Sequence, residues 1–208
     1  YKMIDEGRSV CTLGPIIHNP QVIEDLESKG VKAVSSLSEV PPGFEVVIRA
    51  HGVTKEVMEE LDERGIKYTD ATCPFVLKIH KIIKEQATQD DIILIAGDGN
   101  HPEVCGFRSH CKGASYTFKN AKELEEILRS ISGKENSRKI LLAQTTFSVN
   151  EFKKIRKILE KLCTNSIYFD TICSATQERQ DEAEHLSRWA DVMLVIGGAF
   201  SSNTVKLK

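Results

Sequence analysis

The feature that most constrains the fold is a regular alternation of short apolar runs and longer amphipathic segments along all 208 residues. The run from Ile92 to Ala96 is apolar at every position, as strands buried on both faces of a parallel sheet are. Between positions 149 and 162, Phe152, Ile155 and Leu159 recur with the helical period. This alternation is typical of α/β proteins, in which helices cover mostly parallel sheets.

The same pattern predicts where individual elements lie. Strands are expected at 9–13, 31–34, 45–50, 67–69, 92–96, 114–117, 140–143, 167–169 and 192–196. Helices are expected at 20–29, 55–64, 74–87, 102–109, 121–132, 149–162 and 175–189.

A short motif, Asp-x-x-Cys, occurs twice, ending at Cys73 and at Cys173. Each copy closes a β-prone segment and is followed by a helix-forming run. Pro74 suits a first helical position, where no N–H is needed, and the Ser-Ala-Thr-Gln at 174–177 reads as a capping box. We therefore expect both thiols at helix N-termini, which favour the thiolate. Two such sulfurs in equivalent settings suggest a shared site.

The repeat also divides the chain into similar units. The natural boundaries between these units lie just after the two motifs, where new helices are expected to begin. We therefore expect a first α/β lobe over 1–72, a second over 73–170 and the start of a third over 171–208. The first seven residues resemble the end of a helix capped by Gly7, and the last eight stop where a helix should begin. We expect an internal piece of a longer protein, with its first and third lobes incomplete.

Charge and composition exclude several classes of protein. A net charge of −2 gives no basic field for nucleic acid or an anionic membrane, and 6% aromatic residues leave few stacking platforms. No apolar stretch approaches the roughly 18–20 residues of a membrane-spanning helix, and the N-terminal residues are no signal peptide. Six cysteines without a Cys-x-x-Cys pair favour a reducing cytoplasm over a disulfide framework.

Polar side chains follow the carboxyl ends of several expected strands, where parallel sheets bind ligands. His18, His51 and His101 each follow a strand, and Ser201-Ser202-Asn203 stands at a helix start. Each alone could be a structural histidine or an ordinary helix cap. Together their imidazoles, hydroxyls and amide favour an anion pocket. The remaining histidines, which we expect to be solvated, are His80, His110 and His185.

One acidic residue is a candidate proton carrier. Glu103 follows His101 in a glycine-bearing turn, opposite the expected position of Thr145. A partly desolvated carboxylate there could deliver a proton to a substrate, whereas the plain alternative is a helix-start glutamate that satisfies the helix dipole. The nearby Gly97-Asp-Gly-Asn lacks both the dinucleotide fingerprint and the P-loop lysine.

The motifs occur together in a specific order and spacing. They are His18-Asn19, Ala50-His51-Gly52-Val53, Asp70-Ala71-Thr72-Cys73-Pro74, His101-Pro102-Glu103-Val104, Gln144-Thr145-Thr146, Ile172-Cys173 with Ala175-Thr176, and Ser201-Ser202-Asn203. In this set the chain resembles the 4-hydroxy-3-methylbut-2-enyl diphosphate reductase family, also called LytB, along essentially its whole length. The resemblance implies three α/β lobes around a central iron–sulfur cluster. It also implies reductive dehydroxylation of an allylic diphosphate to isopentenyl and dimethylallyl diphosphate, the last step of non-mevalonate isoprenoid biosynthesis.

The resemblance further implies roles for residues. A 4Fe–4S cluster would take Cys73 and Cys173 as ligands, and the family's third cysteine would lie upstream of this chain, because Cys11 does not match it. Glu103 would be the acid, with Thr145 and His101 in its relay, and electrons would come from a donor such as ferredoxin or flavodoxin. Residues implied in substrate binding are His18, His51, His101, Thr145, Ser201, Ser202 and Asn203. Cysteines without an assigned role are Cys11, Cys105, Cys111 and Cys163.

Other functions remain open from the residues alone. A thiol hydrolase or transferase would use Cys73 or Cys173 as its nucleophile and a histidine as its base. A non-catalytic phosphate-binding module would need only the histidines and the Ser-Ser-Asn segment, and zinc could bind two thiolates plus histidines. Because two thiolates hold a four-iron cluster poorly, we expect the 208-residue piece alone to be inactive or to bind iron only loosely.

Overall fold

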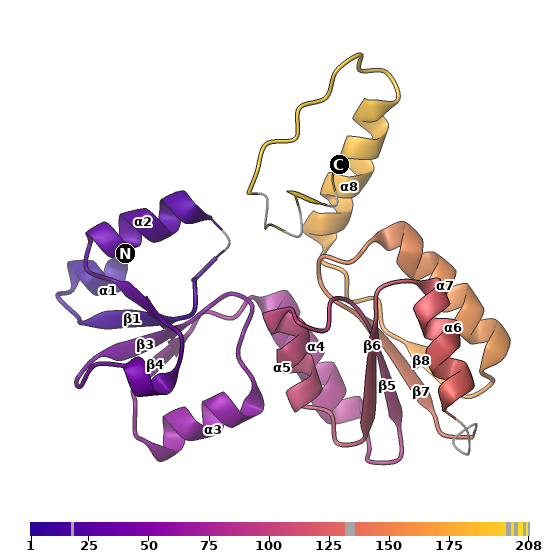
Figure 1. The fold of residues 1–208 in the computed structure, drawn as a ribbon, viewed down its shortest axis with the longest axis horizontal. Coiled ribbons are helices and arrows are strands. Elements are labelled where there is room, and N and C mark those ends of the chain that lie inside the picture. The colour runs from indigo at the N-terminus through magenta and orange to yellow at the C-terminus, as the bar shows by residue number, and fades with distance from the viewer. Residues whose placement is uncertain (18, 132–135, 199–200, 202–203, 206, 208) are drawn as a thin grey trace.

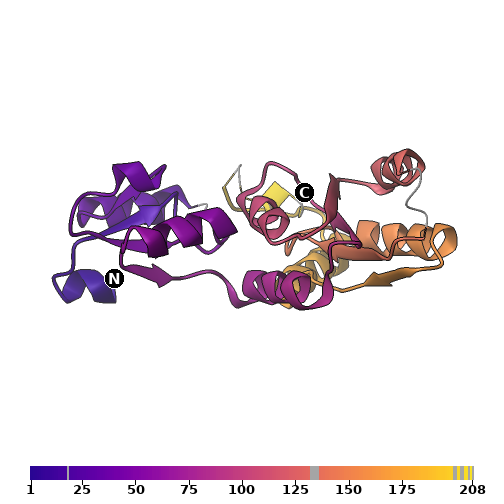
Figure 2. The ribbon, with the colours of Figure 1, turned by 90° about the horizontal axis from the view of Figure 1, so that it is seen from below.

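The computed structural model describes residues 1–17, 19–131, 136–198, 201, 204–205 and 207. Two four-stranded parallel sheets lie side by side along its longest axis (Figures 1 and 2). The first sheet contains β1 (Val10–Leu13), β2 (Lys32–Val34), β3 (Glu45–Ile48) and β4 (Tyr68–Asp70). The second contains β5 (Ile92–Ala96), β6 (Ala114–Phe118), β7 (Lys139–Ala143) and β8 (Ser166–Tyr168). The predicted α/β class with parallel sheets is confirmed.

The two sheets have the same strand order. In chain-order labels they run β2-β1-β3-β4 and β6-β5-β7-β8, and every neighbouring pair is parallel. Each parallel step needs a crossover connection, which accounts for the helices that separate the strands. The repeated Asp-x-x-Cys motif therefore follows the fourth strand of each sheet.

The helices begin where sequence signals place them. In the first lobe they are α1 (Lys2–Asp5), α2 (Pro20–Ser28), the short 3-10 helix η1 (Leu37–Glu39) and α3 (Lys55–Glu63). In the second they are α4 (Pro74–Gln86), α5 (Pro102–Ser109), α6 (Ala121–Ser130) and α7 (Val149–Leu162), and α8 (Ser174–Ser187) follows. A proline occupies the first position of α2, α4 and α5, where its missing N–H is harmless.

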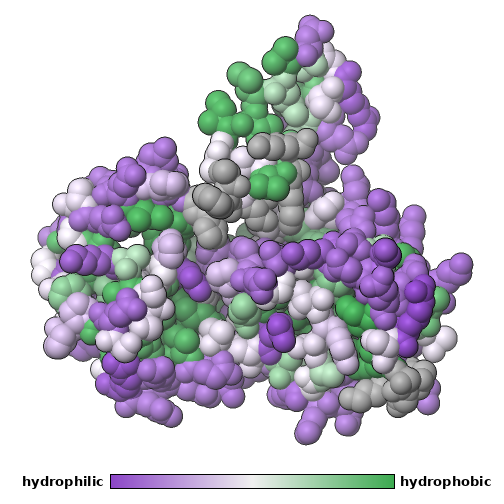
Figure 3. Space-filling view, viewed as in Figure 1, coloured by the Kyte–Doolittle hydropathy of each residue, from purple (hydrophilic) through white to green (hydrophobic). Residues whose placement is uncertain are grey.

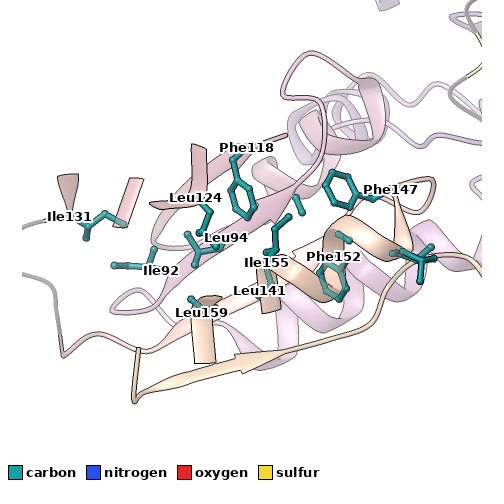
Figure 4. Close-up of a cluster of buried hydrophobic side chains, with 14 residues drawn as sticks. Ile92, Leu94, Phe118, Leu124, Ile131, Leu141, Phe147, Phe152, Ile155 and Leu159 are labelled. Atoms are coloured by element: carbon teal, nitrogen blue, oxygen red, sulfur yellow. The ribbon is translucent and has the colours of Figure 1, made fainter. Parts of the chain in front are cut away.

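Alternation along β5 divides the second core into two layers. Ile92, Leu94 and Ala96 point to one face of the sheet and pack with β7, α6 and α7. Phe118, Phe152 and Ile155 fill the space there (Figure 4). Ile95 points to the opposite face and packs against α4 and α5. Because both faces are covered, the strand is apolar throughout, as expected for a parallel sheet.

Two local predictions are wrong. Residues 192–196 form no strand, because no other described strand lies beside them to accept their backbone hydrogen bonds. Val192, Leu194 and Ile196 are instead 77%, 81% and 93% exposed, and hydrophobic atoms mark this projecting segment in Figure 3. The capping box at 174–177 is also absent. Cys173 is the N-cap of α8 and makes no side-chain capping bond.

Within the ranges given above, no helix is both long enough and apolar enough to cross a lipid bilayer.

Candidate functional site

Both motif cysteines are fixed by the backbone of the neighbouring strand extension. The N–H of Cys73 donates to the Ala50 carbonyl at 2.9 Å, and the N–H of Cys173 donates to the Thr145 carbonyl at 2.8 Å. Ala50 follows β3 and Thr145 follows β7, which occupy equivalent places in the two sheets. Each thiol therefore stands at the carboxyl edge of its own sheet, at the N-cap of α4 or α8.

The aspartates of the two motifs shape the turns that carry the thiols. Asp70 Oδ1 accepts from the N–H of Thr72 at 2.9 Å, and Asp170 Oδ1 accepts from the N–H of Ile172 at 3.4 Å. This two-residue contact is the Asx turn that aspartate favours. It explains why the motif has Asp three positions before Cys in both copies.

A cavity of about 280 Å³ brings the two cysteines together. Both thiols are half-buried and free of disulfides. The residues that line the cavity come from both lobes and from α8, and they are Ile17, Asn19, Ala50, His51, Cys73, Phe75, Val76, His101, Glu103, Thr145, Thr146, Cys173, Thr176, Arg179 and Ser201. The sequence-predicted residues His18, Ser202 and Asn203 lie outside the described residues.

Glu103 is the most buried titratable side chain of this cavity, at 2% exposure. Its Oε1 accepts from the Thr145 N–H at 2.7 Å and its Oε2 accepts from the Thr145 hydroxyl at 3.0 Å. The N–H of Glu103 in turn donates to Nδ1 of His101 at 3.2 Å. The carboxyl group is thereby held by two donors beside an imidazole, in an arrangement suited to proton transfer.

Two imidazoles from different lobes meet at the cavity. The rings of His51 and His101 pack edge to face with centroids 5.3 Å apart. His51 lies in the turn after β3, where Gly52 has a φ of +75°, a conformation that favours glycine. His101 is the N-cap of α5. Neutral or protonated, these rings and the free N–H groups at the start of α5 suit an anionic ligand.

The loop before His101 is fixed by Gln144. Its Oε1 accepts from the Asp98 N–H at 3.1 Å, and its side chain is almost fully buried. A Cβ on Gly97 would lie 3.0 Å from Cβ of Gln144, so only glycine permits this approach without a shift. The loop after β5 and the loop after β7 are thus held together beneath the cavity.

The donor set fits part of a metal centre. Two cysteine sulfurs at one cavity are what an iron–sulfur cluster requires from two of its corners. Among the described residues, no three His, Cys, Asp or Glu side chains converge on a single metal position. The part of the chain that the structure describes therefore supplies an incomplete ligand set.

The sequence reasoning missed several cavity residues. Thr176 and Arg179 follow Cys173 at three-residue steps along α8, a helical spacing that the motif itself could have revealed. Arg179 brings the only guanidinium among the described lining residues.

The expectation that His80 and His110 are solvated is wrong. Their rings pack with centroids 4.5 Å apart and both are half-buried, because α4 and α5 face each other at this point. Burial, aided by His110, lowers the pKa of His80 to about 4, and burial also lowers the pKa of His110. His185, on α8, is exposed as expected.

Comparisons with known proteins agree on one family. The family described as "LytB protein" matches residues 1–208. A 4-hydroxy-3-methylbut-2-enyl diphosphate reductase from Thermoanaerobacter sp. (strain X514) is 41% identical over 205 residues, which is 98% of this chain and 69% of that protein. The reductase of the same name from Caldanaerobacter subterraneus subsp. tengcongensis is 40% identical over 199 residues, 95% of this chain and 67% of that protein.

Two solved structures have the same fold. The E-1-hydroxy-2-methyl-but-2-enyl-4-diphosphate reductase from Plasmodium falciparum matches with a TM-score of 0.88 and 27% identity, over 99% of this chain and 66% of that one. A structure described as (E)-4-hydroxy-3-methyl-but-2-enyl diphosphate reductase, the terminal enzyme of the non-mevalonate pathway, matches with a TM-score of 0.72 and 34% identity, over 99% and 74%. The chain spans about two thirds of the length of these relatives.

Proposed function

Because the chain belongs to the LytB protein family, we propose that it forms most of an iron–sulfur oxidoreductase that removes the hydroxyl group of 4-hydroxy-3-methylbut-2-enyl diphosphate. The products are isopentenyl and dimethylallyl diphosphate, at the terminal step of non-mevalonate isoprenoid biosynthesis. One observation carries the proposal: Cys73, Cys173, Glu103 and two imidazoles line a single cavity between the two sheets.

Cys73 and Cys173 would hold a 4Fe–4S cluster at two of its corners. Both are half-buried thiols at helix N-termini that line the same cavity, and cysteine sulfurs are the usual ligands of such a cluster. When bound, such a cluster would pass on, one at a time, the two electrons that the reduction needs. A small electron-donor protein such as ferredoxin or flavodoxin would replenish them.

The reduction takes up two electrons and two protons and releases the hydroxyl group as water, and Glu103 would hold and deliver one of these protons. Its carboxyl group is buried at the cavity and orientated by the N–H and hydroxyl of Thr145. His101, whose Nδ1 accepts from the Glu103 N–H, lies beside it and would relay protons. The burial of Glu103 keeps competing water away from the transfer.

The diphosphate would lie against the imidazoles and the hydroxyl groups of the cavity. His51, His101, Thr145 and Ser201 all line it. His18, Ser202 and Asn203 complete the set that the sequence predicts. Neutral hydrogen-bond donors, imidazoles and the N-terminus of α5 would orient an anion at this edge.

The direct test is to purify the full natural protein anaerobically, measure iron and sulfide, and assay turnover of 4-hydroxy-3-methylbut-2-enyl diphosphate with a chemical reductant. We expect a brown protein that forms both products. Cys73→Ser and Cys173→Ser should each lose most bound iron and turnover. The matched control is Cys111→Ser, which alters a half-buried thiol that does not line the cavity and should keep both. A colourless, iron-free preparation, or full turnover without Cys173, would refute the proposal.

A further inference from the structure

His80 lies where the two lobes contact each other, outside the cavity. It lies on α4 and its ring packs edge to face on Phe107 of α5, with centroids 5.6 Å apart. It also packs against His110, at the end of the same helix. These two contacts are within the second lobe, but the ring also approaches Gly52 of the first lobe.

Those two glycines leave the space that the imidazole fills. A Cβ on Gly52, which follows His51 in the first lobe, would lie 3.5 Å from Cε1 of His80. A Cβ on Gly106, one turn after Glu103 on α5, would lie 3.2 Å from Nε2. One side chain therefore packs against the turn that carries His51 and against the helix that carries Glu103.

The buried nitrogen of this ring and a backbone oxygen of the first lobe both lie close to Gly106. Nε2 of His80 is buried and has no hydrogen-bond partner among the described residues. The Val53 carbonyl oxygen lies 3.3 Å from the same missing Cβ position on Gly106 that Nε2 approaches to 3.2 Å. Because a buried polar nitrogen without a partner costs free energy, an apolar side chain would pack at this position more favourably.

We propose that His80 is a positioning residue that couples the two lobes, with its neutral imidazole donating from Nε2 to the Val53 carbonyl when the lobes close on the diphosphate. The coupling acts on the cavity through Gly52, whose neighbour His51 packs against His101. This inference rests on the proposed function for the identity of the ligand. The ring is neutral near pH 7, because burial disfavours its charged form.

A hydrogen bond that does not involve His80 also joins the two lobes. The N–H of Lys55, at the start of α3, donates to the hydroxyl of Ser109 on α5 at 2.9 Å. Removing the imidazole should therefore loosen the placement of His51 without separating the lobes. The expected result is weaker ligand binding with little change in the chemical step.

The test measures binding of inorganic pyrophosphate to the full natural protein by calorimetry, and steady-state kinetics of the loaded enzyme. His80→Ala should raise the pyrophosphate Kd and the substrate KM about tenfold, with kcat changed less than about threefold. His80→Gln restores a neutral donor and should return both values to within about threefold of the natural protein. His80→Leu fills space without donating and should behave as His80→Ala. The matched control is His185→Ala, which removes an exposed imidazole on α8.

A second variant reaches the same contact from the other side. Gly106→Ala places a methyl group 3.2 Å from Nε2 and 3.3 Å from the Val53 carbonyl oxygen and should also raise Kd several-fold, even if His80→Ala does not fold. Gly99→Ala, whose Cβ would meet only ordinary contacts at 3.7 Å, is its control. Unchanged Kd and KM in both test variants, or equal rescue by leucine and glutamine, would overturn the coupling. Lack of turnover by the natural protein would instead count against the proposed function, and pyrophosphate binding would still test His80.

Discussion

The carboxyl group of Glu103 is held at both oxygens by one residue, Thr145, and this determines what a substitution there should do. Glu103→Gln keeps an oxygen for the Thr145 N–H but removes the transferable proton. We expect turnover to fall at least about a hundredfold, the usual contribution of a positioned acid, with thermal stability lowered only slightly. Steady-state kinetics and thermal denaturation of the loaded natural enzyme measure the two effects.

The control for that substitution is Glu85→Gln, on the exposed surface of α4, where the carboxylate makes a long ion pair with Lys81 at 3.8 Å. It should leave turnover unchanged. If Glu103→Gln retained more than a third of the natural turnover, the assignment of the proton donor would be wrong.

The hydroxyl of Thr145 can be tested separately from its backbone. Thr145→Val keeps the N–H bond to Glu103 and a similar shape but loses the hydroxyl bond at 3.0 Å. We expect about a tenfold loss of kcat, equivalent to one charge-assisted hydrogen bond. Thr145→Ser retains the hydroxyl and should recover most of it. Natural kcat in Thr145→Val, with a loss confined to Thr145→Ser, would show that the methyl group matters and the hydroxyl does not.

Spacing in the sequence predicts some of the local contacts of the site and misses others. Asp70 and Asp170 each precede a cysteine by three positions, and the structure shows the turns that this spacing predicts. His80 was misjudged because its burial depends on Gly52 and Gly106, which are distant in sequence and visible as neighbours only in the fold. A helical period places a side chain on one face of a helix, and it does not reveal which other element covers that face.

At the scale of elements, an ion pair between a buried carboxylate and a half-buried guanidinium fixes the start of the second sheet. Asp91, just before β5, accepts from the guanidinium of Arg138, just before β7, and from the N–H and hydroxyl of Thr88. Arg138 also donates to the Gln86 carbonyl at the end of α4. The hydrogen bond from Arg138 has the largest effect on Asp91, and together with the bonds from Thr88 it lowers the pKa of Asp91 to about 2.

The corresponding substitution is Asp91→Asn. It should lower the free energy of unfolding by about 2–4 kcal/mol at pH 7, because it leaves Arg138 without its charge partner. Denaturant unfolding measures this loss. Lys112, whose amine reaches only the Lys84 carbonyl at 3.3 Å, offers an exposed control as Lys112→Gln.

The same pair predicts how the loss depends on pH. Since the folded pKa of Asp91 lies below its ordinary value of 3.8, the pair stabilises the fold fully above about pH 4. That contribution is lost as the pH falls through about 2. The difference between the natural protein and Asp91→Asn should therefore shrink by about 2 kcal/mol between pH 5 and pH 2. A difference that stays constant over this range would show that the charge is unimportant.

At the scale of the whole molecule, the parallel sheets could be predicted from alternation, whereas the state of residues 192–196 could not. Their apolar composition matches a buried strand, but strand formation depends on a neighbour that sequence composition does not specify. β5, with similar composition, is buried because β6 and β7 lie on its two sides. The same local pattern thus gives a core strand in one place and an exposed segment in another.

This contrast gives a matched pair of substitutions in the 208-residue chain. Leu194→Ala, at a side chain that is 81% exposed, should change the free energy of unfolding by less than about 0.5 kcal/mol. Leu94→Ala, in the middle of β5, should cost about 2–5 kcal/mol, because it leaves a cavity in the core. Denaturant unfolding of both variants checks the prediction. A comparable loss at Leu194 would mean that the segment is packed in solution.

The tethering of Cys73 and Cys173 to different sheets has a mechanical consequence. The backbone of Cys73 is hydrogen-bonded to the residue Ala50 after β3, and that of Cys173 to Thr145 after β7. Neither sulfur can therefore move far without the sheet to which its loop is bonded. The distance between the two sulfurs then depends on the angle between the two sheets. A ligand that bridges both sulfurs would fix that angle, and amide hydrogen exchange along α4 would slow when it binds.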